Sequence, residues 1–292
     1  MFPTVIDNSM REEFVSCPHS FWLSYVRGLT LPEISVHLHA GIAYAKGLEE
    51  MRRAFYTDGK SIDDSVALGA RALIEAYGEF VPPDDSNKTL SRMVGALLFY
   101  ADSFPLDQDW VTPVIGSNGA SLEYTFAIPL PINNPDTGEP IIYAGRFDML
   151  AQTMGEHCIY DDKTASQLGK QWTKKWRLNS QFTGYSWATR EYGNHAKRII
   201  VRGISILKES YGKEQAIVYR TDAIIDRWYK QLLMEIRQMI SFYQSAWWPR
   251  NQSDSCAAYG GCMFLDSCEK DDPEQWLDNF VIRQYNPLNL EN

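Results

Sequence analysis

Residues 141–188 constrain this chain more than any other part of its sequence. In order, they contain Gly145-Arg-Phe-Asp148, Asp161-Asp162-Lys163-Thr164 and Gln181-x-x-x-Tyr185. Residues 141–150 and 156–162 are short, rich in Ile, Tyr and Phe, and bounded by turn formers, which predicts two strands. Residues 177–191 are expected to form a helix. Asp-x-Lys alone is a weak motif, whereas these three motifs in this order, on strand, strand and helix, form a much more specific pattern.

The two carboxylates and the lysine suit a divalent metal ion. Carboxylate oxygens bind Mg²⁺ or Mn²⁺, and a neighbouring ammonium orients a water or stabilises a developing anion. We therefore expect Asp148 and Asp161 to be metal ligands and Lys163 to be the catalytic cation. Alternate side chains of a strand point to opposite faces, which favours Asp161 over Asp162 as the ligand beside Lys163. The alternative is an exposed Asp/Lys salt bridge at a strand end.

The same motifs resemble the RecB-like branch of the PD-(D/E)xK nuclease superfamily. That branch includes AddB-like, phage exonuclease-like and CRISPR-associated RecB-like proteins, and the resemblance extends from about Ser9 to Cys268. It implies a restriction-endonuclease-like α/β fold, with a mixed central sheet flanked by helices. It also implies that Gln181 and Tyr185, four residues apart on one helix face, lie near the active site and contact the DNA strand. Alternatively, Tyr185 is a core residue and Gln181 a cap or surface residue.

The chain departs from this family pattern at one position. Many relatives have Gly-x-x-x-His with the histidine on the metal, whereas here Gly41 is followed by Ala45. Glu49, one helical turn later, is a candidate replacement ligand, directly or through water. Glu123 matches a family glutamate that faces the site. For both glutamates the alternative is an ordinary surface carboxylate.

Three of the five cysteines gather near the end of the chain. Cys256, Cys262 and Cys268 form a Cys-x5-Cys-x5-Cys series, and Cys17 lies far upstream. In the AddB-like and CRISPR-associated relatives this arrangement binds a [4Fe–4S] cluster, and the resemblance implies the same here with a structural role. Zinc and buried free thiols remain alternatives. Cys158 is expected to be a core residue.

The hydrophobic periodicity predicts one α/β domain over residues 1–292. We expect a helical N-terminal part (1–110), a nuclease core (120–210) and a C-terminal helix with the cysteine cluster (222–292). The predicted helices are 9–27, 40–57, 62–79, 88–104 and 222–247, and further strands are expected at 121–130 and near 198–207.

Composition narrows the function classes. The net charge of −9 argues against a protein that coats nucleic acid through bulk positive charge, although a local basic track would suffice for a nuclease. One candidate track is Lys170, Lys174, Lys175 and Arg177, interleaved with two tryptophans; another is Lys197, Arg198 and Arg202. Ordinary solvated surface is an equally good interpretation of both tracks. No secretory signal or membrane-spanning run is evident, so we expect the cytoplasm of a bacterium or a phage-infected cell.

The sequence thus predicts a metal-dependent DNA exonuclease acting on single strands or DNA ends, in recombination, repair or spacer processing. Because no Walker-type phosphate-binding run is present, any helicase motor would be a separate chain, as would a recombination or CRISPR partner. The alternative is a catalytically weak or inactive RecB-like subunit that binds DNA or assembles a complex, as the missing histidine suggests.

Overall fold

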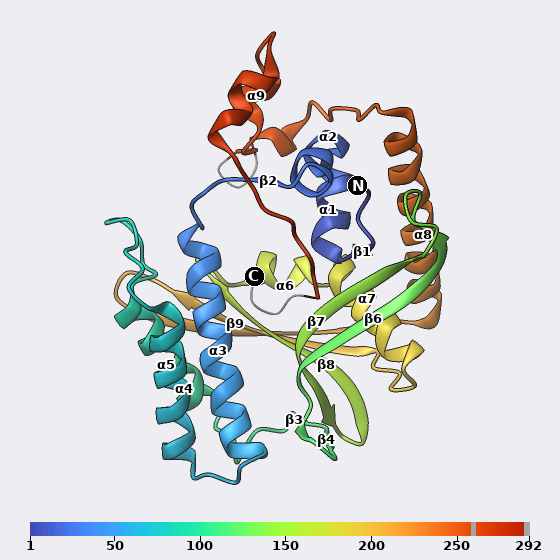
Figure 1. Cartoon of the computed structure of the whole chain (residues 1–292). Helices are drawn as coiled ribbons and strands as arrows, with labels where there is room; N and C mark the ends of the chain where they lie inside the picture. Colours follow the sequence, from blue (N-terminus) through green and yellow to red (C-terminus); the bar gives the residue numbers. More distant parts are fainter. Residues whose placement is uncertain (258–260, 289–292) are drawn as a thin grey trace. The chain divides into compact units, whose positions relative to one another are not determined.

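The computed structural model describes residues 1–257 and 261–288 and divides the chain into two compact units (Figure 1). Unit 1 comprises residues 1–33, 126–145 and 226–292, and unit 2 comprises residues 34–125 and 146–225. The long strands β6 (Leu122–Asn133) and β7 (Pro140–Thr153) each run from one unit into the other. The organisation as one domain stays a prediction.

Unit 2 is built on a mixed sheet. The second half of β7 pairs antiparallel with β8 (Glu156–Ala165), which pairs parallel with β9 (Arg198–Ile206), which pairs antiparallel with β10 (Tyr211–Tyr219). β3 (Thr112–Pro113) also pairs with β7, and β4 (Ile115–Gly116) pairs with β5 (Gly119–Ala120). The predicted strands lie where expected, but β10 was not predicted. This mixed sheet with flanking helices confirms the predicted fold class.

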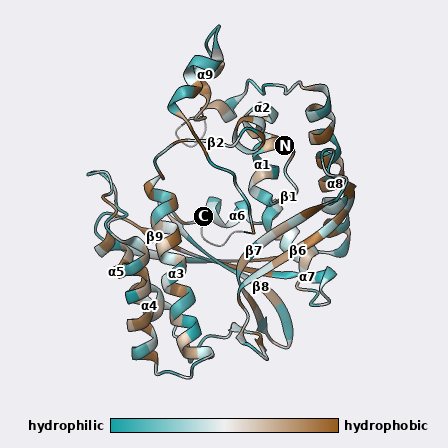
Figure 2. Ribbon diagram, in the orientation of Figure 1, coloured by the Kyte–Doolittle hydropathy of each residue, from teal (hydrophilic) through white to brown (hydrophobic). Residues whose placement is uncertain are grey.

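Three helices form a layer in unit 2. They are α3 (Val36–Tyr56), α4 (Ile62–Tyr77) and α5 (Leu90–Ser103), and they lie side by side (Figure 1). Ser35, Ser61 and Thr89 each accept a backbone hydrogen bond at the helix start, which supplies the N-cap. The helices carry hydrophobic and hydrophilic faces (Figure 2), and their apolar faces bury a shared core with Ile204 and Ile206 of β9.

Two helices connect the parallel strands β8 and β9, as parallel pairing requires. They are α6 (Lys170–Lys175), which was not predicted, and α7 (Ser180–Glu191), which lies within the predicted helix 177–191. Residues 182–189 of α7 are buried throughout. α6 rests on β9 at Gly203, where a Cβ atom would lie only 2.5 Å from the ring of Trp172. Glycine at this position therefore allows α6 to lie close against the sheet.

Unit 1 contains both ends of the chain. It holds β1 (Val5–Ile6), α1 (Asn8–Ser16), α2 (Pro18–Phe21), the π-helical turn η1 (Trp22–Val26), β2 (Leu29–Thr30), most of α8 (Asp222–Ser245), η2 (Asp254–Cys256), α9 (Leu265–Cys268), η4 (Pro273–Asn279) and β11 (Val281–Ile282). The first half of β7 pairs with β1 and β6.

The prediction of one continuous N-terminal helix was wrong, because Cys17 adopts an extended conformation and Pro18 starts a new helix. The first helix is capped by Asp7, whose carboxylate accepts the Met10 N–H at 2.8 Å. Gly145 of the first motif packs against Phe126, whose ring a Cβ atom would approach to 2.6 Å. Over the described part of the chain, no helix is long and apolar enough to cross a membrane.

Candidate active site

Two carboxylates face each other across β7 and β8. The register pairs Met149 with Tyr160, and its continuation by one residue brings Asp148 opposite Asp161 on one face of the sheet. Asp161 is almost fully buried, with 2% of its surface exposed. Burial raises the pKa of Asp148 to about 7, and the charge of Asp161 adds to this rise. Two facing carboxylates with a raised pKa create a site that favours a bound cation.

Lys163 supplies a cation next to this pair. Its ammonium forms an ion pair with the Asp161 carboxylate. Burial lowers the pKa of Lys163, but the charges of Asp161 and Asp148 outweigh it, and the net shift is upward. Lys163 therefore stays protonated at neutral pH and acts as a cation rather than as a base.

Asp162 points to the opposite face and belongs to a buried polar network. Its Oδ2 forms an ion pair with Arg52 Nη2 of α3 at 2.6 Å, and its Oδ1 accepts a hydrogen bond from the Tyr160 hydroxyl at 2.9 Å. Arg52 also donates to the Tyr100 hydroxyl at 2.7 Å. The Asp162 backbone N–H donates to Asp148 Oδ2 at 2.6 Å. This network fixes β8 against α3 and α5, and it thereby positions Asp148.

A cavity of about 310 Å³ opens beside Asp148 and Lys163. It is lined from α3, β6, β7 and β8, all within unit 2. Four of its lining groups form two ion pairs, Glu49 with Lys46 and Glu123 with Arg146, both at 2.9 Å. We call this cavity the catalytic cavity. Its wall carries both carboxylates and the long basic side chains that pair with them.

Comparison with known proteins assigns this arrangement to a family. The family model of the PD-(D/E)XK nuclease superfamily matches residues 9–269. The chain belongs to the PD-(D/E)XK nuclease superfamily. The protein is therefore a nuclease, and members of this superfamily generally use divalent metals such as Mg²⁺.

One solved structure shows a similar fold. A crystal structure from Eubacterium rectale, provisionally described as an exonuclease, has a TM-score of 0.53 at 11% identity, and the match covers 87% of this chain and 86% of that one. A crystal structure of SSO0001 is matched with a TM-score of only 0.27 at 14% identity, over 77% of this chain and 82% of that one. No curated protein matches the nuclease.

The residues present fit a divalent ion. Over residues 1–257 and 261–288, no three His, Cys, Asp or Glu side chains form a ready-made metal site. Mg²⁺, however, often takes only one or two protein carboxylates and completes its shell with water and phosphate oxygens. Asp148 and Asp161 provide that pair. Burial and the charge of Asp148 raise the pKa of Glu123 to about 7. Glu123 is close enough to interact electrostatically with both Asp148 and Asp161.

Glu123 also has an unusual backbone conformation. Its φ is +47°, in the left-handed region that non-glycine residues rarely adopt. Such strain is found preferentially at functional sites, where the fold enforces it. Glu49 lines the same cavity wall, on α3. The structure thus brings both predicted glutamates to the catalytic cavity, and their role as ligands stays a prediction.

Ala45 lies on the cavity wall, where many relatives have a histidine. His37 also lines the cavity, near the start of α3. His39, by contrast, contacts the Tyr77 carbonyl through Nε2 at 2.8 Å and stacks on Phe80 at 4.1 Å between ring centroids. His39 therefore has a structural role, and of these two histidines only His37 lines the cavity.

Gln181 and Tyr185 are not among the described residues that line this cavity. Tyr185 is 4% exposed, its hydroxyl donates to the Arg146 carbonyl at 2.7 Å, and its ring packs on Phe147. It thus supports β7 next to Asp148. Gln181 is half-buried on the first turn of α7. Contact of the pair with a DNA strand stays a prediction.

Sequence reasoning missed one residue that lines the cavity, Tyr44, and one that contacts its lining, Lys88. Tyr44 on α3 is buried, and its hydroxyl has no hydrogen-bond partner among the described residues although the residue lines the cavity. Lys88 donates through Nζ to the Thr164 hydroxyl at 3.2 Å, just after the Asp-x-Lys motif. Tyr44 precedes Ala45 in the Gly41-x-x-x-Ala45 segment, and that segment was the sequence signal that could have indicated Tyr44 as a site residue.

Four cysteines line a separate cavity of about 910 Å³ within unit 1, which we call the cysteine cavity. They are Cys17, Cys256, Cys262 and Cys268. The Cys262 N–H donates to the Cys256 carbonyl at 2.8 Å, and burial raises the pKa of the Cys262 thiol. Among the described residues, however, the thiols are not gathered closely enough for a metal site. Cys158 is fully buried, as expected of a core residue.

The second predicted basic track is contradicted at Arg202. Arg202 is 1% exposed and forms an ion pair with Asp109, 2.7 Å between Nη2 and Oδ1. Lys197 forms an ion pair with Asp222, and Arg198 with Glu156. These cations are therefore committed to structural ion pairs.

Proposed function

We propose that the nuclease hydrolyses phosphodiester bonds of DNA at the catalytic cavity. The observation that carries this proposal is the pair of facing carboxylates, Asp148 and Asp161, with the Lys163 ammonium ion-paired to one of them. Asp148 and Asp161, with Glu49 and Glu123, would hold Mg²⁺ or Mn²⁺. A bound divalent ion would lower the pKa of a water and neutralise phosphate charge.

Lys163 has a defined role in this proposal. A protonated ammonium at the cavity wall is an electrostatic stabiliser of the extra negative charge that develops on the phosphate oxygens in the transition state. The Lys46 and Arg146 side chains, each paired with a glutamate, supply further positive charge for the flanking phosphates. No base-reading group is evident among these residues, which favours low sequence specificity.

We further propose an exonuclease of the RecB-like branch, acting on single strands or duplex ends in recombination, repair or spacer processing. The motif resemblance and the fold shared with the E. rectale protein support this mode. Helicase, recombination or CRISPR partners would be separate chains. The cysteine cavity is proposed to take a [4Fe–4S] cluster with a structural role, supported by the common lining of Cys17 and the C-terminal three cysteines.

The nuclease proposal is tested on labelled linear single-stranded DNA, linear duplex DNA and closed circular single-stranded DNA with Mn²⁺. Linear molecules should be degraded and circles spared, and EDTA should stop the reaction. Asp161→Ala should abolish cleavage. Asp63→Asn, a change at an exposed acid of α4, is the control and should not affect it. Absence of cleavage by the wild type, or full activity of Asp161→Ala, would favour an inactive DNA-binding or assembly subunit.

The cluster proposal is tested separately by an anaerobic absorption spectrum with iron and acid-labile sulfide analysis. A broad band at roughly 400 nm and near-stoichiometric iron and sulfide are expected. Zinc in their place, or four thiols that titrate freely in the native protein, would exclude the cluster.

A further inference from the structure

A second surface of unit 2 carries positive charge next to an open strand edge. A groove of about 1020 Å³ runs between α6 with its following turn and strand β10. We call it the α6–β10 groove. Its lining residues are Thr173, Lys174, Lys175, Arg177, Leu178, Ile224 and the β10 residues 215–219.

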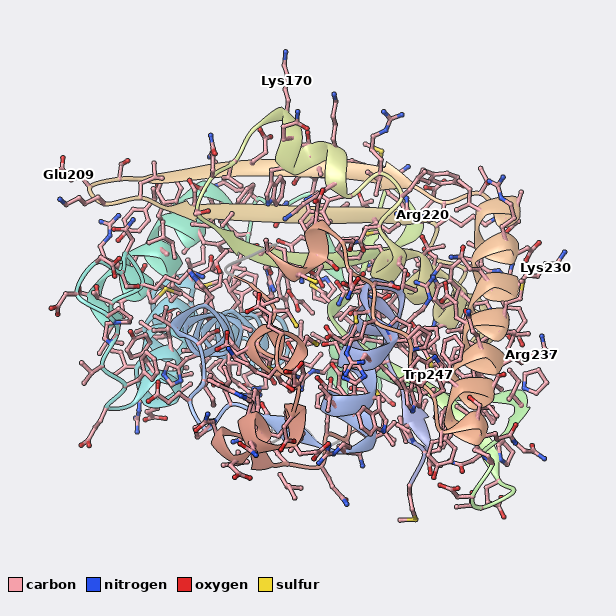
Figure 3. All side chains as sticks on the ribbon, turned by 90° about the horizontal axis from the view of Figure 1, so that it is seen from above. Lys170, Glu209, Arg220, Lys230, Arg237 and Trp247 are labelled. Carbon is pink, nitrogen blue, oxygen red and sulfur yellow. The ribbon has the colours of Figure 1, made fainter. Side chains whose placement is uncertain are left out.

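The cations of this groove have no acidic partners. Lys174, Lys175 and Arg177 are exposed, and within residues 1–257 and 261–288 none of them forms an ion pair with a carboxylate. No carboxylate is among the described lining residues either. Lys170, at the start of the same helix, projects away from the ribbon (Figure 3). In a chain of net charge −9, this local excess of positive charge indicates an anionic ligand.

A buried arginine holds one wall of the groove in place. Arg220, directly after β10, is fully buried, and its guanidinium donates to the Trp176 carbonyl at 3.0 Å, the Arg177 carbonyl at 2.7 Å and the Thr183 hydroxyl at 2.8 Å. Among the described residues it has no carboxylate partner. Arg220 therefore anchors the turn after α6, which carries Arg177 of the groove wall.

The floor of the groove offers hydrogen-bond donors. β10 pairs only with β9 in the described part of the sheet. The Arg220 N–H donates to the Lys197 carbonyl, so the even-numbered residues of β10 bond to β9. The N–H groups of Ile217 and Tyr219 consequently point away from β9, at the free edge of the sheet, and both residues line the groove.

The groove lies close to the catalytic cavity. Lys163 of β8 is paired in register with Gly203 of β9, and Gly203 with Glu214 of β10. Two strand spacings therefore separate Lys163 from Glu214, about 10 Å, and the lining of the groove begins at the next residue, Gln215. The positive charge of Lys163 also contributes, after burial, to lowering the pKa of Lys175.

We propose that the α6–β10 groove binds the phosphate backbone of a single nucleic-acid strand that extends beyond the catalytic cavity. This inference rests on the proposed nuclease function. The phosphates would be contacted by Lys174, Lys175 and Arg177 and by the two outward N–H groups. An extended peptide added to the β10 edge is the competing occupant, but a row of cations without carboxylate partners among the described residues fits a repeating polyanion better.

Binding is measured without cleavage, in full-length protein carrying Asp161→Asn and in EDTA, by fluorescence anisotropy of labelled dT16 over a range of salt. Lys174→Gln with Arg177→Gln should weaken binding about tenfold and reduce the salt slope by about 1.4, from two lost phosphate contacts. Lys60→Gln with Lys208→Gln, two exposed cations of unit 2 outside the groove, should change neither quantity.

Unaltered dT16 affinity and salt slope in the groove variant would overturn the proposal, provided its thermal unfolding matches that of the parent. If the groove variant loses binding to a poly-glutamate peptide but binds dT16 like the parent, the groove is a peptide site, and the proposal is also overturned. If the wild type cleaves no DNA but the groove variant loses dT16 binding, the proposed hydrolysis fails and the groove stands. If cleavage is normal and the variant binds dT16 like the parent, only the groove fails.

Discussion

The catalytic cavity of unit 2 and the cysteine cavity of unit 1 hold their functional side chains in different ways. Asp148 lines the catalytic cavity, and Asp161 is buried behind its wall, outside the described lining residues. The two lie on adjacent strands whose register brings them opposite each other, and the Arg52–Asp162 network anchors those strands. In the cysteine cavity, the thiols come from the short segments η2 and α9, from the turn before α9 and from the break between α1 and α2. The sheet thus preforms one site, whereas the thiols of the other come from short elements that no sheet register holds together.

The largest effect is expected from removing a charge of the preformed site. Asp161→Asn keeps the size of the side chain but deprives a cation of one ligand and Lys163 of its ion-pair partner. Cleavage of linear DNA should fall at least about a thousandfold. The rate is measured under single-turnover conditions with Mn²⁺, and a loss of less than about tenfold would show that the carboxylate pair is not the catalytic centre.

The network behind the carboxylates should govern stability. Arg52→Ala leaves Asp162 buried without its cation, and the free energy of unfolding should fall by about 3–5 kcal/mol. Arg71→Ala, which removes an exposed Arg–Glu pair on α4, should cost less than about 0.5 kcal/mol. Equal effects of the two variants in urea unfolding would contradict the view that this network anchors the strands.

The pH dependence of the folding stability distinguishes a preformed acidic site from a group of ordinary surface carboxylates. Asp148 and Glu123 have folded-state pKa values of about 7, against ordinary values of about 4. Between these values the folded state retains protons that the unfolded chain has released, so the stability of the metal-free protein should fall as pH rises from about 4 to about 7.

The stabilisation by a bound metal should increase as pH rises, because the carboxylate ligands must be deprotonated to bind it. The increase in melting temperature caused by Mn²⁺ should therefore be larger at about pH 8 than at about pH 5. Asp148→Asn should flatten this difference. A stabilisation by Mn²⁺ that is the same at both pH values in the wild type would contradict the account.

The smallest effect is expected at Tyr44. Tyr44→Phe keeps the buried ring and removes a hydroxyl that has no partner among the described residues. Cleavage should slow by about fivefold, as for the loss of one hydrogen bond to substrate, with unfolding little changed. Tyr77→Phe is the matched control. It removes a hydroxyl that donates to the Lys88 carbonyl at 2.6 Å and should lower stability by about 1 kcal/mol. A stability loss at Tyr44 as large as at Tyr77 would assign Tyr44 to the core alone.

Local patterns predicted the parts of the fold that depend on neighbours in sequence. Strand alternation placed Lys163 with Asp161 and away from Asp162, and apolar periodicity located the helices α3, α4, α5 and α8. Strand β10 was missed although Ile217, Val218 and Tyr219 favour strands. The N-terminal helix was predicted as continuous because the apolar spacing outweighed the signal of Pro18.

Long-range contacts could not be predicted in this way. Arg52 and Asp162 are 110 residues apart in sequence, and no local rule pairs them. The Tyr44 hydroxyl, which lacks a partner in the part of the chain that the structure describes, and the carbonyl contacts of Arg220 likewise depend on how distant elements pack. The grouping of Cys17 with the C-terminal cysteines came from family resemblance, and the structure places all four around one cavity.

The central claim is that Asp148 and Asp161 together bind a divalent cation beside Lys163. Anomalous diffraction from a crystal soaked in Mn²⁺ tests it most directly. The account predicts a manganese peak bridging the two carboxylates, at the roughly 2.2 Å expected for such a metal–oxygen contact. A peak bound elsewhere, or none at saturating Mn²⁺ with both carboxylates still facing each other, would contradict it.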